Sequence, residues 1–166
     1  MDHVNRRAVL TGLAAAAATV ASGAARADDW KAYHNPRFDF SFEYPGWFAA
    51  ADTSENSDGS RFEAKDGAAI LAYGSWNALD ENPLTIEQHE AFVRGNDDYS
   101  GLTYRFADAK TLVLSGLRGE TVYYEKYLLV RDNDLILNLQ ITYPAQYKPV
   151  YDPLIGRMAK SLRYNQ

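Results

Sequence analysis

The most regular alternation of apolar and polar residues lies in the segment 37–48, which reads RFDFSFEYPGWF. Successive side chains of a strand point to opposite faces, so this pattern predicts a strand with its aromatic rings on one side. Pro45-Gly46 should end the strand, because proline cannot donate to a ladder and glycine suits a turn. We expect the rest of the domain to pack on this aromatic face, which is formed by Phe38, Phe40, Phe42 and Tyr44.

Further strands are predicted on both sides of a helical segment. Residues 61–65 and 68–76 predict a hairpin around Asp66-Gly67, a favoured two-residue turn. The second arm is apolar on both faces, which is typical of a central strand covered on two sides. Four more strand-like runs follow between residues 102 and 143, and Pro144 ends the last of them.

Two segments have helical periodicity. Thr85 should cap the first helix, because Gln88 stands three residues later as in a capping box. The second helix is predicted from about Asp152 to Leu162 after a looser turn, since the prolines there are tolerated only near a helix start. This order of elements predicts an α+β fold, with a single antiparallel sheet flanked by helices as an α/β/α sandwich.

The first 27 residues have the pattern of an export signal. Arg6-Arg7 form a charged start, an alanine-rich apolar run follows, and Ala25-Arg26-Ala27 gives the small-x-small pattern of a signal peptidase site. We therefore expect cleavage between Ala27 and Asp28. This cleavage would leave residues 28–166 as one domain without a stable membrane anchor, in the periplasm or outside the cell.

The start of this signal resembles the twin-arginine export signal. It departs from that pattern at Asn5, where Ser or Thr is usual, and at Val9, where Phe is commonest. The alternative is a general secretory signal that carries two arginines. If the twin-arginine route applies, the domain folds in the cytoplasm before export.

Charge and cysteine usage exclude several classes of function. Residues 1–27 hold three of the 17 Lys and Arg and one of the 22 Asp and Glu, which leaves 14 basic and 21 acidic residues and a net charge of −7. An acidic domain without a basic run is a poor nucleic-acid binder and is repelled by anionic lipid. The chain has no cysteine, which excludes disulfides, thiol catalysis, cysteine-ligated metals and lipoprotein anchoring.

Short patterns at both ends of the mature chain resemble a known family. The opening N-x-R-F-x-F-x-x-x-Y-P at residues 35–45 resembles the start of PsbP-like and DcrB-like domains. Their closing pattern is similar to Tyr143-Pro144, Tyr151-Asp152-Pro153 and Ser161-Leu162 in this sequence. The resemblance implies an antiparallel sheet sandwiched by helices and a binding or accessory role, as in photosystem-associated lumenal proteins and bacterial envelope proteins. It implies no catalytic residues.

The sequence offers no catalytic or cofactor signature. After cleavage two histidines remain, His34 and His89, and no G-x-S-x-G motif, phosphate loop or dinucleotide fingerprint occurs. A lone histidine has many structural uses, so we expect His34 in a loop and His89 at the edge of the core. We also expect no metal site, because the acidic clusters lack EF-hand spacing and Asp is a common turn residue. These clusters are Asp52, Glu55 and Asp58, and Asp132 and Asp134.

The remaining feature is the aromatic content of 12 Tyr, seven Phe and three Trp. Most rings should be core, but Trp47 and Phe48 follow the end of the first strand and Trp76 closes another, so these three could rim a ligand-binding groove if the strand ends lie together. We therefore predict a non-catalytic exported module that binds an envelope protein, and its sign would be an exposed apolar patch. The alternatives are a small-ligand carrier, with a closed aromatic cavity, and a hydrolase, with a histidine beside a nucleophile in a cleft.

Overall fold

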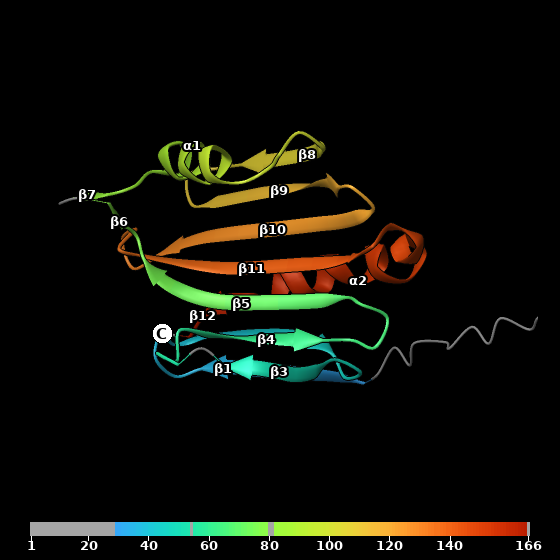
Figure 1. The fold of residues 1–166 in the computed structure, drawn as a ribbon. Helices are drawn as coiled ribbons and strands as arrows, with labels where there is room; N and C mark the ends of the chain where they lie inside the picture. Colours follow the sequence, from blue (N-terminus) through green and yellow to red (C-terminus); the bar gives the residue numbers. More distant parts are fainter. Residues whose placement is uncertain (1–28, 54, 80–81, 166) are drawn as a thin grey trace, which may run out of the picture.

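The computed structural model describes residues 29–53, 55–79 and 82–165, and its largest element is a seven-stranded antiparallel sheet (Figure 1). The predicted hairpin is confirmed, because two adjacent strands pair around Gly67, whose φ of 89° suits glycine. The last two long strands pair from Thr121↔Pro144 to Val130↔Leu135. In spatial order the strands are β3 (Ala49–Thr53), β4 (Gly59–Glu63), β5 (Ala69–Trp76), β11 (Leu135–Pro144), β10 (Thr121–Val130), β9 (Thr111–Arg118) and β8 (Leu102–Ala107).

The predicted aromatic strand belongs to a second sheet, so the expectation of a single sheet is wrong. This sheet consists of β1 (Trp30–Asn35), β2 (Phe40–Pro45) and β12 (Arg163–Tyr164). The chain turns after β2 through a hydrogen bond from Phe48 N–H to the Pro45 carbonyl, and it then enters β3 of the large sheet. The aromatic face of β2 consequently packs flat against the large sheet instead of joining its edge. A short pair, β6 (Ala78–Leu79) and β7 (Asn82–Pro83), precedes the first helix.

The two helices lie close to their predicted positions. In α1 (Ile86–Asn96) the Thr85 hydroxyl accepts from Gln88 N–H, and the Gln88 side chain accepts from Thr85 N–H at 2.9 Å, which confirms the capping box. The second helix, α2 (Lys148–Ser161), begins four residues before the predicted start, after the 3₁₀ turn η1 (Ala145–Tyr147). It starts early because Pro149 sits in the first turn, where its missing N–H has no intrahelical partner to lose.

The layers on the two faces of the large sheet are staggered. On one face, called the α2 side, α2 and the small sheet cover β4, β5, β11 and β10. Phe40, Phe42 and Met158 are fully buried there, and Leu154 packs against the same core, as expected from the sequence. Gly74 makes room for this layer, because a Cβ atom at Gly74 would lie 2.6 Å from the Phe38 ring.

On the opposite face, called the α1 side, α1 covers a different part of the sheet. Ile86 of α1 packs with Leu112 and Leu114 of β9 and with Tyr127 and Leu129 of β10. Each face of the sheet is therefore only partly covered. The α2 side is open over β8 and β9, and the α1 side is open over β3, β4 and β5. No described helix is long and apolar enough to cross a membrane.

Candidate functional site

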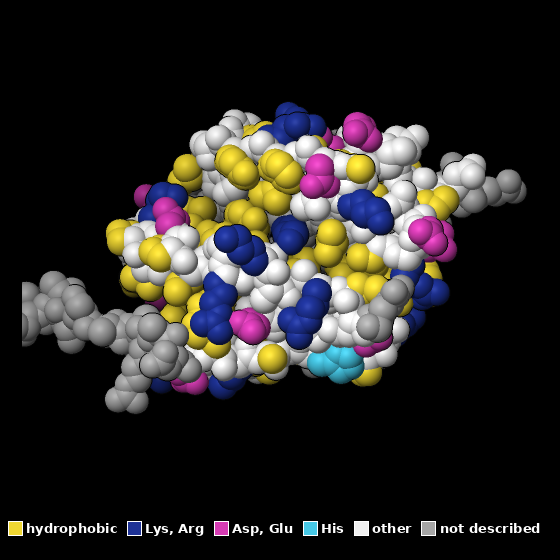
Figure 2. Space-filling view, turned by 180° about the vertical axis from the view of Figure 1, so that it is seen from behind, with side chains coloured by type: hydrophobic (Ala, Val, Ile, Leu, Met, Phe, Trp, Pro, Cys, Tyr) yellow, Lys and Arg dark blue, Asp and Glu magenta, His cyan; other side chains and the backbone are white. Residues whose placement is uncertain are grey.

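Large apolar side chains are exposed on the open part of the α2 side. Tyr104 and Phe106 alternate on β8, so both project from the same face, and Leu117 lies on the neighbouring strand β9. Their exposed fractions are 54%, 44% and 38%. We call these three residues the α2-side patch, and Figure 2 shows apolar side chains gathered on this face of the molecule.

A hollow of about 260 Å³ separates this patch from helix α2. We call it the α2 groove. Gly156 belongs to its helical wall, and a Cβ atom added there would meet nothing within 4 Å, so the groove is open at this point. Pockets that enclose drug-sized ligands span roughly 300–1,000 Å³, so this groove has room for one or two side chains instead. Its lining comprises Tyr104, Ser115, Val122, Tyr124 and Tyr143 from the sheet and Lys148, Asp152, Ile155 and Gly156 from α2.

Asp152, Lys148 and Tyr143 of the α2 groove are already partnered. Asp152 accepts a hydrogen bond from the Tyr143 hydroxyl at 2.6 Å and lies 3.2 Å from the ammonium of Lys148. Burial raises the pKa of Tyr143, and it raises the pKa of Tyr124 to about 12. Both phenols thus stay protonated at neutral pH and can donate hydrogen bonds.

Positive charge gathers around α2 although the chain as a whole is acidic. Residues 145–165 carry four cations and one carboxylate, a net charge of +3 in a chain of net charge −5. Figure 2 shows Lys and Arg side chains spread over this face. Arg157 pairs with Glu43 at 2.9 Å and stacks over the Trp30 ring, whereas Lys160 is exposed. The open end of the sheet on this side is therefore both apolar and bordered by cations.

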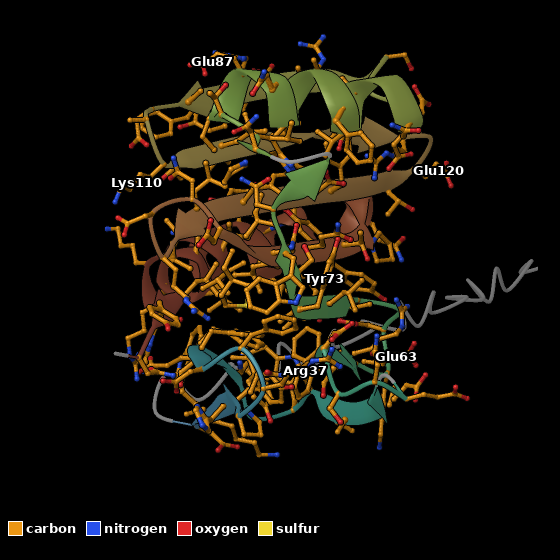
Figure 3. All side chains as sticks on the ribbon, turned by 90° about the vertical axis from the view of Figure 1, so that its left-hand side faces the viewer. Arg37, Glu63, Tyr73, Glu87, Lys110 and Glu120 are labelled. Carbon is orange, nitrogen blue, oxygen red and sulfur yellow. The ribbon has the colours of Figure 1, made fainter. Side chains whose placement is uncertain are left out.

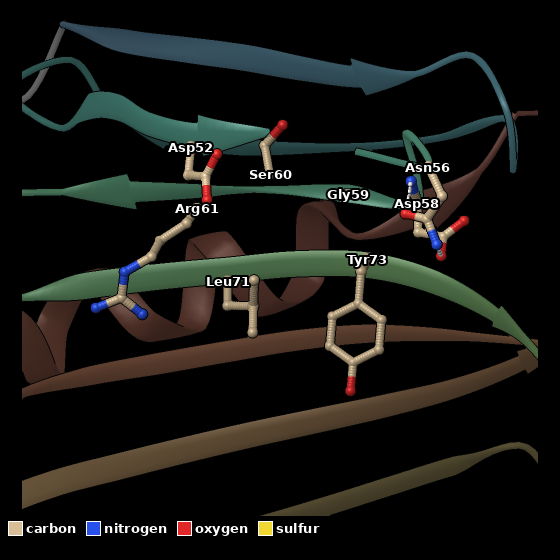
Figure 4. Close-up of a pocket in the computed structure, with 8 residues that line it drawn as sticks. All are labelled: Asp52, Asn56, Asp58, Gly59, Ser60, Arg61, Leu71 and Tyr73. Atoms are coloured by element: carbon tan, nitrogen blue, oxygen red, sulfur yellow. Dashed lines mark hydrogen bonds between the residues drawn. The ribbon is translucent and has the colours of Figure 1, made fainter. Parts of the chain in front are cut away.

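The open part of the α1 side has a different character. A shallow hollow of about 440 Å³ lies over β4 and β5, with the Leu71 and Tyr73 side chains on its floor (Figure 4). Arg61 borders it and pairs with Glu63 at 2.8 Å, and Figure 3 shows Glu63 on the side of the sheet away from α2. The acidic loop beside it is also engaged, because Asp58 lies 3.0 Å from the guanidinium of Arg37. We call this region the α1-side hollow.

The three predicted groove residues do not meet. Phe48 is only 1% exposed and packs against Tyr151, whose hydroxyl donates to Asp66 just before the start of β5. Trp47 lies beside Phe48, with ring centroids 6.3 Å apart. Trp76 ends β5, about 23 Å from its start at 3.3 Å per residue. The expectation of one shared rim is therefore wrong, because the two strand ends point in opposite directions.

The two histidines occupy different surroundings. His89 is 8% exposed and packs against the Tyr127 ring, at the edge of the core as expected. His34 lies in β1 instead of a loop, with Nδ1 3.4 Å from the Ser41 hydroxyl and Nε2 4.0 Å from Asp39. This resembles a nucleophile–base pair in composition, but the His34 side chain is 55% exposed and the Ser41 hydroxyl accepts from Asn165 at 2.9 Å. The described residues contain no group of three or more His, Cys, Asp or Glu that could hold a metal.

Sequence reasoning missed a buried charge cluster on the α1 side. Glu125 of β10 is 3% exposed and accepts from the hydroxyls of Tyr99 at 2.5 Å and Tyr127 at 2.9 Å, and from Arg118 at 2.9 Å. Burial, with this carboxylate nearby, raises the pKa of both tyrosines. The cluster ties the segment after α1 to the sheet. Its signal in the sequence was the placement of Glu125 between two inward-facing tyrosines at every second position.

The comparisons with known proteins identify the fold alone. No family model matches the chain, and no curated protein matches it. The solution structure of cyanobacterial PsbP (CyanoP) from Synechocystis sp. PCC 6803 is 15% identical, covers 87% of this chain and 95% of its own, and has a TM-score of 0.56. The Saccharomyces cerevisiae Ran-binding protein Mog1p is 11% identical, covers 82% and 96%, and has a TM-score of 0.52. The chain therefore has a PsbP-like α+β fold, as the end motifs led us to expect.

Proposed function

We propose that this protein is an exported, non-catalytic accessory module that binds another protein of the bacterial envelope. The observation that carries this proposal is the α2-side patch, in which two rings and a leucine remain exposed on the edge of a sheet. Contiguous apolar surface of this kind on a soluble domain is typical of a contact site, because each exposed ring loses the free energy of burial. Scattered single residues would need no such explanation.

The structural neighbours support a binding role. The yeast neighbour is a Ran-binding protein, and the cyanobacterial one is a PsbP protein. A shared fold does not fix a function, so this support is secondary to the patch.

Export is part of the same proposal. The signal at residues 1–27 lies outside the described residues, so the pattern around Arg6-Arg7 carries it. Replacing both arginines by lysine should abolish periplasmic accumulation if the twin-arginine route applies. Unchanged periplasmic yield of this variant would assign the chain to the general secretory route.

Site-specific photo-crosslinking in the producing cells tests the binding role. A photoreactive residue at Phe106 or Leu117 should give one discrete crosslinked protein, identified by mass spectrometry and confirmed by reciprocal purification. The same residue at Glu63, on the other side of the sheet, is the matched control and should give no such product. Absence of a crosslinked protein at both patch positions would contradict the proposal.

A small-ligand carrier is the second candidate, and the α1-side hollow favours it. Its volume of about 440 Å³ falls within the roughly 300–1,000 Å³ range of ligand pockets, and it combines Arg61 and Asp52 with the Tyr73 ring. Native mass spectrometry of protein purified from the periplasm distinguishes the two functions. A retained small molecule that is lost on Tyr73→Ala would support the carrier, whereas its absence would leave the protein-binding role alone.

A further inference from the structure

We propose that the α2 groove binds an extended segment of the partner protein, with one apolar side chain inserted beside Gly156 and carboxylates on either side of it. This inference rests on the proposed protein-binding function and specifies where the partner is held and by what chemistry. Three features of the described residues carry it: the size of the groove, the distribution of charge along α2, and the gap at Gly156.

The size of the groove selects a side chain instead of a free ligand. Its volume of about 260 Å³ is below the range of pockets that enclose drug-sized molecules. Val122 and Ile155 give it apolar walls, and the exposed ring of Tyr104 forms its outer border. A single aliphatic or aromatic side chain would bury these surfaces, and the rest of the segment would lie over the α2-side patch.

The charges along α2 select the residues that flank this side chain. Lys148, Asp152, Gly156 and Lys160 follow one another at four-residue spacing and so share one stripe of the helix. Asp152 is already engaged by Tyr143 and Lys148, so it leaves the stripe with an excess of positive charge. At the far end of the stripe, the Lys126 ammonium lies against α2, donating to the Ala159 carbonyl at 2.7 Å. Lys148 thus lines the groove, while Lys126 and Lys160 lie further along α2. The stripe therefore has cations at both ends, and they complement carboxylates on both sides of the inserted residue.

Gly156 is the residue that keeps the groove open. Glycine in a helix interior is less favourable than alanine by about 1 kcal/mol. No neighbouring atom requires glycine here, because an added Cβ atom would meet nothing within 4 Å. A longer side chain at this position would occupy the space in which the partner side chain lies.

An extended protein segment fits these features better than a lipid surface. The chain carries a net charge of −5, which opposes binding to anionic lipid. A bilayer also takes up apolar side chains that protrude, whereas this site is a hollow between α2 and the sheet. Sedimentation with lipid vesicles distinguishes a membrane from a protein segment directly.

Selection of random peptides displayed on phage against the purified protein tests the inference. The enriched sequences should share an aromatic or aliphatic residue flanked by Asp or Glu, and the corresponding synthetic peptide should bind less tightly as salt increases. Gly156→Trp should weaken this binding about tenfold or more, the equivalent of about 1.4 kcal/mol. Gly95→Trp is the matched control, because Gly95 is a glycine of α1 that also has open space around it.

Charge reversal provides the second arm. Lys160→Glu should weaken peptide binding and reduce its dependence on salt, whereas Lys65→Glu, in the exposed turn before β5, should change neither. Thermal unfolding of every variant verifies that it is folded. Enrichment of basic peptides, absence of a shared motif, or binding that is insensitive to Gly156→Trp would overturn the inference.

The outcomes also separate this inference from the function on which it rests. If crosslinking at Phe106 persists while no acidic peptide is selected, the protein binds a partner elsewhere on this face and the groove assignment is wrong. If neither occurs, the protein-binding function fails as well. Sedimentation with phosphatidylglycerol vesicles that is lost in Lys160→Glu, without peptide selection, would assign the surface to a membrane and overturn the inference.

Discussion

The two open regions of the large sheet differ in the polarity of their exposed side chains. On the α1 side the exposed groups of β4 are charged, and Arg61 and Glu63 pair with each other. On the α2 side the exposed groups of β8 are the Tyr104 and Phe106 rings. No ion pair offsets their exposure, and contact of their apolar surface with water is unfavourable. Both regions lie outside the covering layers, so the difference between them comes from their side chains. The charged side chains of the α1 side satisfy each other, whereas the apolar ones of the α2 side are suited to a protein partner.

The two covered regions also differ in the polarity of their buried side chains. Under α2 the core is almost entirely aromatic and aliphatic, with Phe40 and Phe42 fully buried. Under α1 the core also holds the carboxylate of Glu125 and the imidazole of His89. The buried carboxylate and imidazole groups thus lie in the α1-side core. Stability should therefore depend on pH through the α1 side and on ring packing through the α2 side.

The largest expected effect compares a covered with an uncovered phenylalanine on the same side. Phe42→Ala should reduce the free energy of unfolding by about 3–5 kcal/mol, because it leaves a cavity in the aromatic core. Phe106→Ala should cost less than about 1 kcal/mol, since its ring is already 44% exposed on an edge strand. Chemical denaturation measures both. A cost above about 3 kcal/mol for Phe106→Ala would mean that the patch is part of the core.

The next effect concerns pH and the α1 side. Burial lowers the pKa of His89 to about 4, whereas a histidine in an unfolded chain titrates near 6.5. The folded state thus favours the neutral ring. The free energy of unfolding is therefore at its full value above about pH 6.5. As the pH falls from about 6.5 to about 4, it decreases by about 3 kcal/mol at most, because protonation of His89 favours the unfolded chain.

Replacement of His89 tests this pH dependence. Because its Nε2 atom makes no hydrogen bond within the described part of the chain, His89→Leu should flatten the loss of stability between about pH 6.5 and 4 without orphaning a partner. The measurement is denaturant unfolding across that range. His34→Leu, at the exposed histidine of β1, is the control and should retain the wild-type slope. Equal slopes in wild type and His89→Leu would show that another group controls acid stability.

A smaller difference in stability is expected between the loss of a buried and the loss of an exposed ion pair on the α1 side. Arg118→Met removes one partner of Glu125, which is 4% exposed in its side chain, and should cost about 2 kcal/mol because a buried charge loses its cation. The two tyrosine hydroxyls still donate to Glu125 and limit the loss. Arg61→Met breaks a pair exposed at 47% and 52% and should cost less than about 1 kcal/mol. Similar costs for both would contradict the difference between the two regions.

The sequence predicted local structure well, because the relevant signals lie within a few residues of one another. The Thr85 cap, the turn at Asp66-Gly67 and the alternation along β11 each determine their own element. The division into two sheets was not predictable in this way. The alternation in β2 predicts which face is buried. It does not predict whether the strand joins the large sheet at its edge or packs on its face.

The candidate site was less predictable than the fold. Tyr104 and Phe106 show the same alternation as the buried rings of β2, and their exposure follows only from the edge position of β8 and from where α2 ends. Conversely, Trp47 comes just after one strand and Trp76 closes another, which suggests a shared site, but sequence does not specify the direction in which each strand runs. The arrangement of layers decides which apolar positions remain open, and that arrangement depends on contacts between segments far apart in the chain.

The smallest expected effect is a gain, and it tests whether the α2 groove is open in the free protein. Gly156→Ala should raise the free energy of unfolding by up to about 1 kcal/mol, because alanine favours the helix and its methyl group meets nothing within 4 Å. Gly95→Ala, near the end of α1, should gain less, since helix ends fray. A methyl group occupies little of the groove, so peptide binding should survive the alanine and fail with tryptophan. If Gly156→Ala instead destabilises the protein, the space beside Gly156 is already filled, and the contrast between an open apolar region and a self-paired polar one would no longer hold.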